Sequence, residues 1–152
     1  MTRRYIGSDP LSVWDRRFLA LAEHIGGWSK DPSTQVGAVI VRPDRTIASV
    51  GYNGFPRGVV DDPGRLADRA LKYPRTVHAE LNAVLSANEP VKGYTLYVTP
   101  LSPCSNCAGA IIQAGISRVV AKCGQVPPRW LEDFTTAGSM FDEAGVQVVI
   151  VP

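Results

Sequence analysis

Residues 95–121 read TLYVTPLSPCSNCAGAIIQAGISRVVA, and this segment contains a complete strand–helix–strand pattern. Thr95–Val98 and Arg118–Ala121 are short apolar runs, which are typical of buried strands. Cys104–Ala114 between them has the character of a helix, and Gly115 ends it. Two strands joined by a helix in this way are expected to lie parallel, through a right-handed crossover.

Upstream of this unit, the chain predicts a helix and then two strands. The helical pattern opens at Asp9-Pro10-Leu11-Ser12 and ends at Gly26-Gly27, with apolar residues at spacings of three and four: Trp14, Phe18, Leu21, Ala22 and Ile25. Gln35–Val41 and Thr46–Tyr52 are rich in β-forming residues and are joined by turn-forming ones, so a hairpin is expected.

The remaining segments predict loops, two helices and a last strand. Asn53–Gly58 and most of Asp61–Pro74 are polar or turn-forming and are expected to be loop, with a short helix around Leu66–Leu71. Val146–Val151 closes the chain as a strand. Two helices and their inward residues are predicted as follows: Val77–Ala87 with Leu81, Val84 and Leu85, and Arg129–Ala144 with Leu131, Phe134 and Met140.

The order of elements predicts an α/β fold, in which a mixed sheet has helices packed on both faces. The length of 152 residues fits one domain, 1–152, and the hydrophobic fraction of 45% is enough for a core. The formal net charge of +2 is too small to indicate nucleic acid as a partner.

The first residues, MTRRYIGSDP, are not followed by the apolar run of a secretory signal. No segment approaches the roughly 18 to 20 apolar residues of a membrane helix, so no membrane partner and a cytoplasmic location are expected. Three cysteines, an odd number, favour metal binding or catalysis over a disulfide framework.

The sequence Pro103-Cys104-Ser105-Asn106-Cys107 is the first candidate for chemistry. Ser102 is expected to be the N-cap of the helix and Pro103 its first residue, which places both cysteines in the first turn. Residues three apart on a helix lie on the same side and can share one ion, and the helix N-terminus favours thiolates.

His78 and Glu80 complete the candidate site. Two thiolates and His78 give three protein ligands, which leaves the fourth position of a tetrahedral zinc ion open for water, as in catalytic sites. Two thiolates and a neutral imidazole also cancel the charge of the metal, so a base beside the water is needed, and Glu80 is the candidate. For His78 and Glu80 to face one ion, His78 must precede the regular helix.

Each motif has another interpretation when it is taken alone. A Cys-x-x-Cys pair in a cytosolic protein can be a redox pair, half of a structural zinc site or two buried thiols. His78-Ala79-Glu80 by itself indicates little. Together, His-x-Glu followed by Pro-Cys-x-x-Cys matches the signature of the zinc-dependent deaminases of nucleobases.

From about Ser29 to Val120 the chain resembles the deoxycytidylate branch of the cytidine/deoxycytidylate deaminases. The zinc motif is shared by the whole superfamily, whereas the loop Gly-Tyr-Asn-Gly followed by Pro-Arg-Gly is similar to the deoxycytidylate branch. The segments that carry the resemblance are 29–38 (SKDPSTQVGA), 51–58 (GYNGFPRG), 78–83 (HAELNA), 97–99 (YVT) with Pro103-Cys104, and 110–116 (AIIQAGI).

The resemblance implies a three-layer αβα sandwich with about five strands, as in cytidine-deaminase-like folds. It implies a zinc ion bound by His78, Cys104 and Cys107, and hydrolysis of dCMP to dUMP and ammonia by a zinc-activated water, with Glu80 as the proton shuttle. It further implies a homo-hexamer controlled by dCTP and dTTP through Gly51-Tyr52-Asn53-Gly54.

Three further residues are candidates for the substrate by this resemblance. Asn53 is expected to hold the sugar or the base edge, although an Asn-Gly pair also serves as a turn. Lys30 and Arg57 are expected to contact the phosphate, and the alternative for both is a solvated surface charge. Some relatives carry a second, structural zinc; here only His24 and Cys123 remain as ligands, in the first helix and at a strand end, so one zinc per chain is expected.

Two other functions remain open from the sequence. The chain could deaminate a 5-substituted dCMP, free cytidine or deoxycytidine, or a base in RNA, and the low charge without a basic aromatic patch disfavours RNA. The chain could also be a zinc-stabilised binding module without turnover. Glu80 disfavours this module, because a structural site needs no carboxylate beside an open coordination position.

Overall fold

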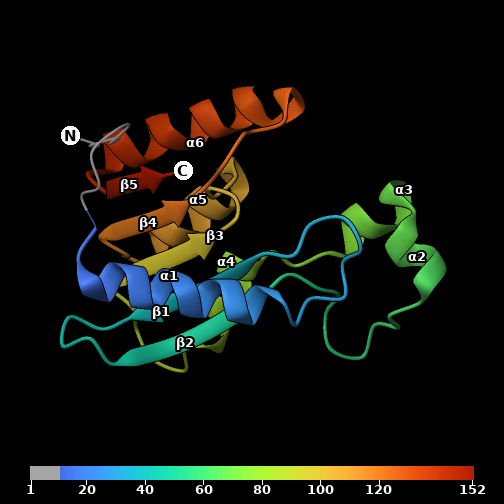
Figure 1. The fold of residues 1–152 in the computed structure, drawn as a ribbon, viewed down its shortest axis with the longest axis horizontal. Helices are drawn as coiled ribbons and strands as arrows, with labels where there is room; N and C mark the ends of the chain where they lie inside the picture. Colours follow the sequence, from blue (N-terminus) through green and yellow to red (C-terminus); the bar gives the residue numbers. More distant parts are fainter. Residues whose placement is uncertain (1–10) are drawn as a thin grey trace.

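A five-stranded mixed sheet forms the middle of the molecule, in the order β2-β1-β3-β4-β5 (Figure 1). The computed structural model describes residues 11–152. The predicted helix start at Asp9-Pro10 and the segment MTRRYIGSDP, which was predicted not to be a secretory signal, lie outside the described residues. β1 pairs antiparallel with β2 and β3, whereas β3, β4 and β5 are parallel, as predicted. The strands are Gly37–Val41 (β1), Ile47–Tyr52 (β2), Thr95–Thr99 (β3), Arg118–Lys122 (β4) and Gln147–Val151 (β5).

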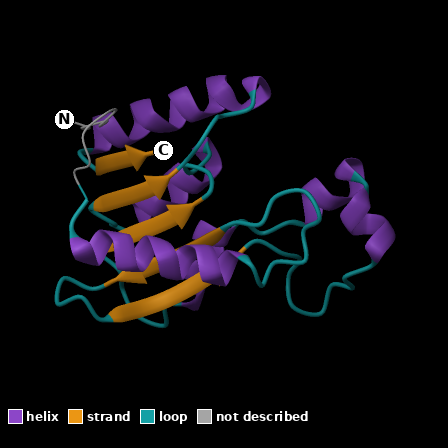
Figure 2. Ribbon diagram, viewed as in Figure 1, coloured by secondary structure: helices purple, strands orange, loops and turns teal. Residues whose placement is uncertain are grey.

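Helices cover both faces of this sheet, which confirms the expected three-layer sandwich (Figure 2). One helix, α1, packs on one face, and α4, α5 and α6 lie on the other. None of the helices in residues 11–152 has the length and apolar character needed to cross a membrane. The helices are Val13–Gly26 (α1), Pro63–Ala67 (α2), Arg69–Lys72 (α3), Ala79–Ser86 (α4), Ser105–Gln113 (α5) and Leu131–Ala144 (α6), with 3-10 turns at Tyr73–Arg75 (η1) and Pro128–Trp130 (η2).

Strand β1 contributes side chains to the hydrophobic cores on both faces of the sheet. Val39 and Val41 pack with Phe18 and Ala22 of α1, whereas Ala38 and Ile40 belong to the core under α4, α5 and α6. Successive side chains of a strand point to opposite faces, so a strand covered on both sides has no polar alternation. This explains why the whole of β1 is buried.

The predicted inward face of the helix at 77–87 was wrong at Leu85, whereas Val84 packs against the core and Leu81 is half-buried. The buried positions of α4 are Ala79, Glu80 and Ala83, and Leu85 is 68% exposed. The cause is the close approach of α4 to β2: a Cβ atom on Gly51 would lie 2.4 Å from the Ala79 carbonyl oxygen and 2.5 Å from the Ala83 nitrogen. Only small residues fit such a contact, so alanines occupy this side of α4 and Leu85 is exposed.

We expect Gly51→Ala to lower the free energy of unfolding by about 3 kcal/mol, because the added methyl group must displace the α4 backbone. Urea unfolding followed by circular dichroism measures this change. Gly54→Ala is the matched control, since a Cβ there meets nothing within 4 Å, and it should stay within about 0.5 kcal/mol of wild type. Equal effects of the two substitutions would contradict the close approach.

Two other helices differ from prediction at their ends. Cys104, rather than Ser102, is the N-cap of α5, and its sulfur accepts a hydrogen bond from the Cys107 backbone N–H at 3.5 Å. The last helix starts at Leu131, which is 52% exposed and not inward. Its buried residues are Ala137, Gly138 and Phe141, with Phe134 and Met140 only half-buried.

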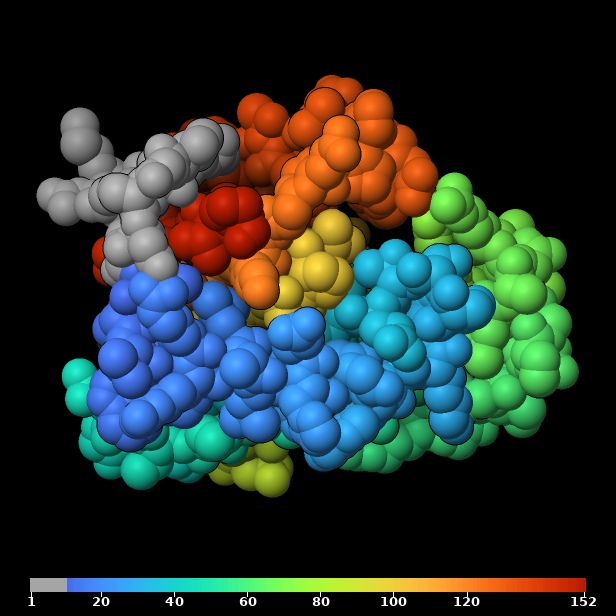
Figure 3. Space-filling model, in the orientation of Figure 1, coloured from blue at the N-terminus to red at the C-terminus, as the bar shows by residue number. Residues whose placement is uncertain are grey.

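The segment between β2 and α4 forms an extension at one end of the sandwich (Figure 1). Instead of one helix around residues 66–71, it holds α2, α3 and η1. The reason is Asp68, whose extended backbone ends α2 and whose carboxylate caps α3 by accepting the Ala70 N–H at 2.9 Å. Between this extension and the start of α6 the surface is hollowed, and residues near 100 lie recessed there (Figure 3).

Candidate active site

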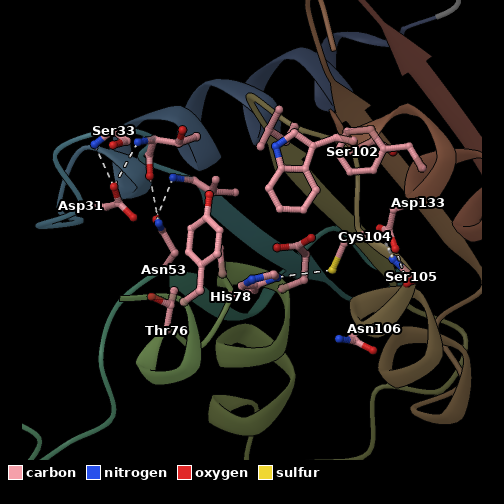
Figure 4. Close-up of a pocket in the computed structure, with 18 of the residues that line it drawn as sticks. Asp31, Ser33, Asn53, Thr76, His78, Ser102, Cys104, Ser105, Asn106 and Asp133 are labelled. Carbon is pink, nitrogen blue, oxygen red and sulfur yellow. Dashed lines mark hydrogen bonds between the residues drawn. The ribbon is translucent and has the colours of Figure 1, made fainter. Parts of the chain in front are cut away.

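Three metal-ligating side chains meet at the amino-terminal ends of α4 and α5. His78 is the N-cap of α4 with an extended backbone (φ −69°, ψ 155°), so it precedes the regular helix as the site requires. His78 Nδ1 lies 3.4 Å from Cys104 Sγ and 3.3 Å from Cys107 Sγ (Figure 4). Within residues 11–152, these three form the one group of His, Cys, Asp and Glu side chains close enough to hold a metal.

The spacing of the three atoms fits zinc. Bonds of about 2.3 Å to sulfur and about 2.0 Å to nitrogen, in a tetrahedral arrangement, separate the ligand atoms by about 3.5 Å. The two nitrogen–sulfur distances are close to this value. One imidazole and two sulfurs are also a donor set that zinc prefers, and they leave one of its four positions free.

The two cysteine thiols differ in pKa, and therefore in how readily each becomes the thiolate that binds a metal. Hydrogen bonds from the Cys107 thiol, the His78 ring and the Cys107 backbone hold the pKa of Cys104 well below its usual range. The same thiol–thiolate contact, together with burial, raises the pKa of Cys107. The pair therefore shares one proton, and metal binding is accompanied by its loss, because a coordinating thiol is deprotonated.

Glu80 is buried beside this group. It lies in the first turn of α4, its exposed fraction is 5%, and it lines the same cavity as His78 and Cys104. Burial raises the pKa of the Glu80 carboxyl to about 7, because the charged form loses its contact with water. A carboxyl group that gains and loses a proton near neutral pH suits general acid–base chemistry.

The cavity above these residues has a volume of about 330 Å³, which is in the range of small-molecule sites. Four parts of the chain enclose it: the loop 31–36 with Asn53, the extension around α3, the end of β3 with the start of α5, and η2 with the start of α6. Rings of Tyr73 and Trp130 meet across the mouth, with centroids 6.4 Å apart.

Asn53 is brought to this cavity and is 6% exposed. Its Oδ1 accepts the Val36 N–H at 2.8 Å, and its Nδ2 donates to the Thr34 carbonyl at 2.9 Å. One N–H and one acceptor site of the amide remain for another partner. The Asn53 side chain therefore holds the backbone of residues 34–36 in place along the cavity wall.

Lys30 and Arg57 are placed away from the cavity. Lys30 Nζ forms an ion pair with Asp61 at 2.7 Å, and 68% of the lysine side chain is exposed. It borders a smaller, adjoining cavity of about 90 Å³ that is also lined by Tyr52, Gly54 and Phe55 and that shares Asn53 with the main cavity. Arg57 is exposed and lines neither cavity.

No sequence motif indicated the basic residues that do line the main cavity: Arg69, Lys72 and Arg129. Lys72 is 4% exposed, and its Nζ lies 3.1 Å from Asp31 Oδ1, which also accepts the Ser33 N–H. Lys72 and Asp31 are 41 positions apart in the sequence, so no local sequence pattern indicates that they pair. The pair fastens the extension to the loop after α1.

His24 and Cys123, the candidates for a second metal site, lie in different surroundings. His24 contacts the ring of Trp28, with centroids 5.7 Å apart. Cys123 is buried beside a cavity of about 210 Å³, lined mostly by apolar residues of α6 and β5. Neither side chain belongs to the group formed by His78, Cys104 and Cys107.

Comparison with known proteins agrees with this geometry. The sequence profile described as "Cytidine and deoxycytidylate deaminase zinc-binding region" matches residues 12–123, which include all three ligands and Glu80. The chain belongs to this family. This deaminase therefore has a zinc-binding domain, and the three ligands predicted from the sequence lie together as such a domain needs.

Relatives and solved structures support the same placement of this deaminase. It is 46% identical over 144 residues to an uncharacterised deaminase in the luxG 3′ region of Aliivibrio fischeri, covering 93% of this chain and 96% of the relative. It is 42% identical to the human deoxycytidylate deaminase, covering 91% and 79%. The structure of the cyanophage S-TIM5 dCMP deaminase in complex with dCMP and dUMP aligns with a TM-score of 0.75 and 25% identity, covering 95% and 100%.

Proposed function

We propose that this chain, as a single deaminase domain over residues 1–152, hydrolyses dCMP to dUMP and ammonia. The observation that carries the proposal is the buried Glu80 beside His78, Cys104 and Cys107, at the base of a cavity of nucleotide size. Relatives named deoxycytidylate deaminase, and a neighbouring structure that contains dCMP and dUMP, support this substrate.

His78, Cys104 and Cys107 would hold the zinc ion, which when bound supplies a Lewis acid that makes water a better nucleophile. Glu80 takes a proton as the water oxygen bonds to C4 of the ring and passes it to N3. Glu80 later carries a proton to the departing amino group, so that the C4–N bond breaks and ammonia leaves.

Arg69 and Arg129, in place of Lys30 and Arg57, are proposed to contact the 5′-phosphate. Both arginines line the cavity, one from α3 and the other from η2. Lys72 also lines it but is paired with Asp31, so it is less available to an anion. Guanidinium groups bind phosphate through two parallel hydrogen bonds, which suits two arginines facing one anion. Asn53 is proposed to contact the sugar or base with its remaining amide sites.

Control by dCTP and dTTP, a hexameric assembly and a cytoplasmic location also remain proposals. The first rests on the family resemblance; Lys30, Tyr52 and Gly54 border a cavity of about 90 Å³ at the end of β2, which has room for only part of a nucleotide. The close contact of Gly51, near the end of β2, with Ala79 and Ala83 links this segment to α4, the helix that carries Glu80.

The test is to incubate the zinc-loaded protein with cytidine, deoxycytidine, CMP, dCMP and 5-methyl-dCMP and to measure the ammonia released. We expect dCMP to have the highest kcat/KM. Cys104→Ala is the matched control; it removes one of three ligands and should lose nearly all zinc and all ammonia release. Ammonia from none of the nucleotides would refute a cytosine deaminase, and a preference for deoxycytidine would refute the substrate.

A further inference from the structure

A carboxylate of α6 reaches the turn that carries the two cysteines. Asp133 Oδ2 accepts the Ser105 backbone N–H at 2.9 Å, and Asp133 Oδ1 accepts the Ser105 hydroxyl at 2.5 Å (Figure 4). Asp133 also lines the cavity, together with Ser105 and Cys104. We propose that Asp133 is a positioning residue that holds the first turn of α5 in the geometry zinc needs; this rests on the metal site of the proposed function.

The reason lies in how α5 begins. Cys104 is the N-cap and Ser105 the first helical residue, so the orientation of the peptide between them sets the direction of the Cys104 side chain. Asp133 restrains this residue twice, at its backbone N–H and at its hydroxyl. Cys104 Sγ in turn accepts the Cys107 N–H at 3.5 Å, so the position of one sulfur is tied to the backbone of the other.

A helix packing contact alone would not need this arrangement. Packing of α5 and α6 is supplied by their apolar faces, which include Ala108, Ile111, Ala137 and Phe141. The carboxylate instead lies at the end of the interface, beside the ligand turn, where its negative charge is close to the sulfurs. Hydrogen bonds to atoms that orient metal ligands raise the affinity of the site for its metal.

Asp133 positions Ser105 through its hydrogen bonds rather than through its negative charge. Two thiolates and a carboxylate at one helix end repel one another, so the charge of Asp133 does not favour the thiolates. An asparagine can accept the Ser105 N–H through its carbonyl and donate to the Ser105 hydroxyl through its amide. Asp133→Asn should therefore keep the positioning, whereas Asp133→Ala should lose it.

The test is zinc affinity, measured by titrating the zinc-loaded protein with a chelator, and needs no substrate. Loss of hydrogen bonds around a ligand typically weakens metal binding by about 10- to 100-fold, which is the change expected for Asp133→Ala. Asp133→Asn should stay within about threefold of wild type. Glu132→Ala, the exposed acidic neighbour in the same turn of α6, is the control and should leave the affinity unchanged.

A double-mutant cycle with Ser105→Ala separates positioning from general stability. Ser105→Ala removes the hydroxyl contact but keeps the backbone N–H contact, so Asp133→Ala should cause a smaller further loss in this background than it causes in the wild type. Ser105→Ala alone serves as the test if Asp133→Ala does not fold. The absorption of the sulfur–metal bonds in the cobalt(II) form should shift in Asp133→Ala and return in Asp133→Asn.

Three results would overturn the proposal: wild-type zinc affinity in Asp133→Ala, equal losses in Asp133→Ala and Glu132→Ala, or the same loss in both backgrounds of the cycle. Each of them would leave deamination of dCMP untouched, because the zinc-saturated protein would still turn over its substrate. Conversely, inactivity toward all cytosine nucleotides would refute the proposed function without changing these affinities.

Discussion

Glu80→Gln is expected to reduce kcat for dCMP by about 10⁴-fold or more while the protein keeps its fold and its zinc. A single general acid–base residue contributes about 10² to 10⁴-fold, and Glu80 would serve in more than one proton transfer of the cycle. The amide has almost the same shape as the carboxyl group, so the packing of this buried position is retained. Ammonia release, zinc content and circular dichroism measure the three properties.

Glu89→Gln makes the same chemical change outside the cavity. Glu89 pairs with Arg42 and accepts a hydrogen bond from the Tyr94 hydroxyl, far from the metal ligands in the fold. This variant should deaminate dCMP at close to the wild-type rate. A Glu80→Gln enzyme that kept a tenth of the wild-type rate would show that another group moves the protons.

The second large effect concerns the phosphate. We expect Arg69→Ala and Arg129→Ala each to lower kcat/KM for dCMP by about one to two decades, since a hydrogen bond to a charged group contributes about 1.5 to 3 kcal/mol. The double variant should lose about two to four decades, provided that the two contacts are independent. The slower reaction of deoxycytidine, which has no phosphate, should be nearly unchanged.

Arg57→Ala and Lys30→Ala are the controls, because they remove a positive charge outside the main cavity. They should leave the ratio of dCMP to deoxycytidine activity as it is. If Arg57→Ala lowered this ratio and the cavity arginines did not, the phosphate site inferred from the sequence resemblance would be the better one. If both substrates declined together in Arg129→Ala, the arginine would support the wall instead, through its contact with the Trp130 ring.

Much of the fold follows from local pattern, because the period of the apolar residues differs between helix and strand. The run at β1 and the helix–Gly115 sequence at α5 are examples where the pattern and the observed element agree. The ligand triad was also predictable, since His-x-Glu and Pro-Cys-x-x-Cys restrict both residue type and spacing. The position of His78 ahead of the regular helix was predictable too, because His78 and Glu80 can face one ion only in that way, and its backbone is extended.

The failures have physical causes that a single segment does not contain. Leu85 could not be recognised as exposed, because the depth of α4 in the sandwich depends on the missing side chain of Gly51 on another element. Likewise, the roles of Arg69 and Asp133 depend on which distant segments the tertiary fold brings together. An acidic residue in the first turn of a helix ordinarily indicates only a favourable interaction with the helix dipole.

Two of the three metal ligands are also the caps of the helices they precede, and the two helices begin 26 residues apart. A ligand that binds only the folded chain shifts the folding equilibrium, by about 4 kcal/mol when its free concentration is a thousand times its Kd. Metal occupancy and resistance to unfolding are therefore one linked equilibrium in this deaminase. The concentration of an ion in the surrounding solution becomes part of what keeps α4 and α5 on the sheet.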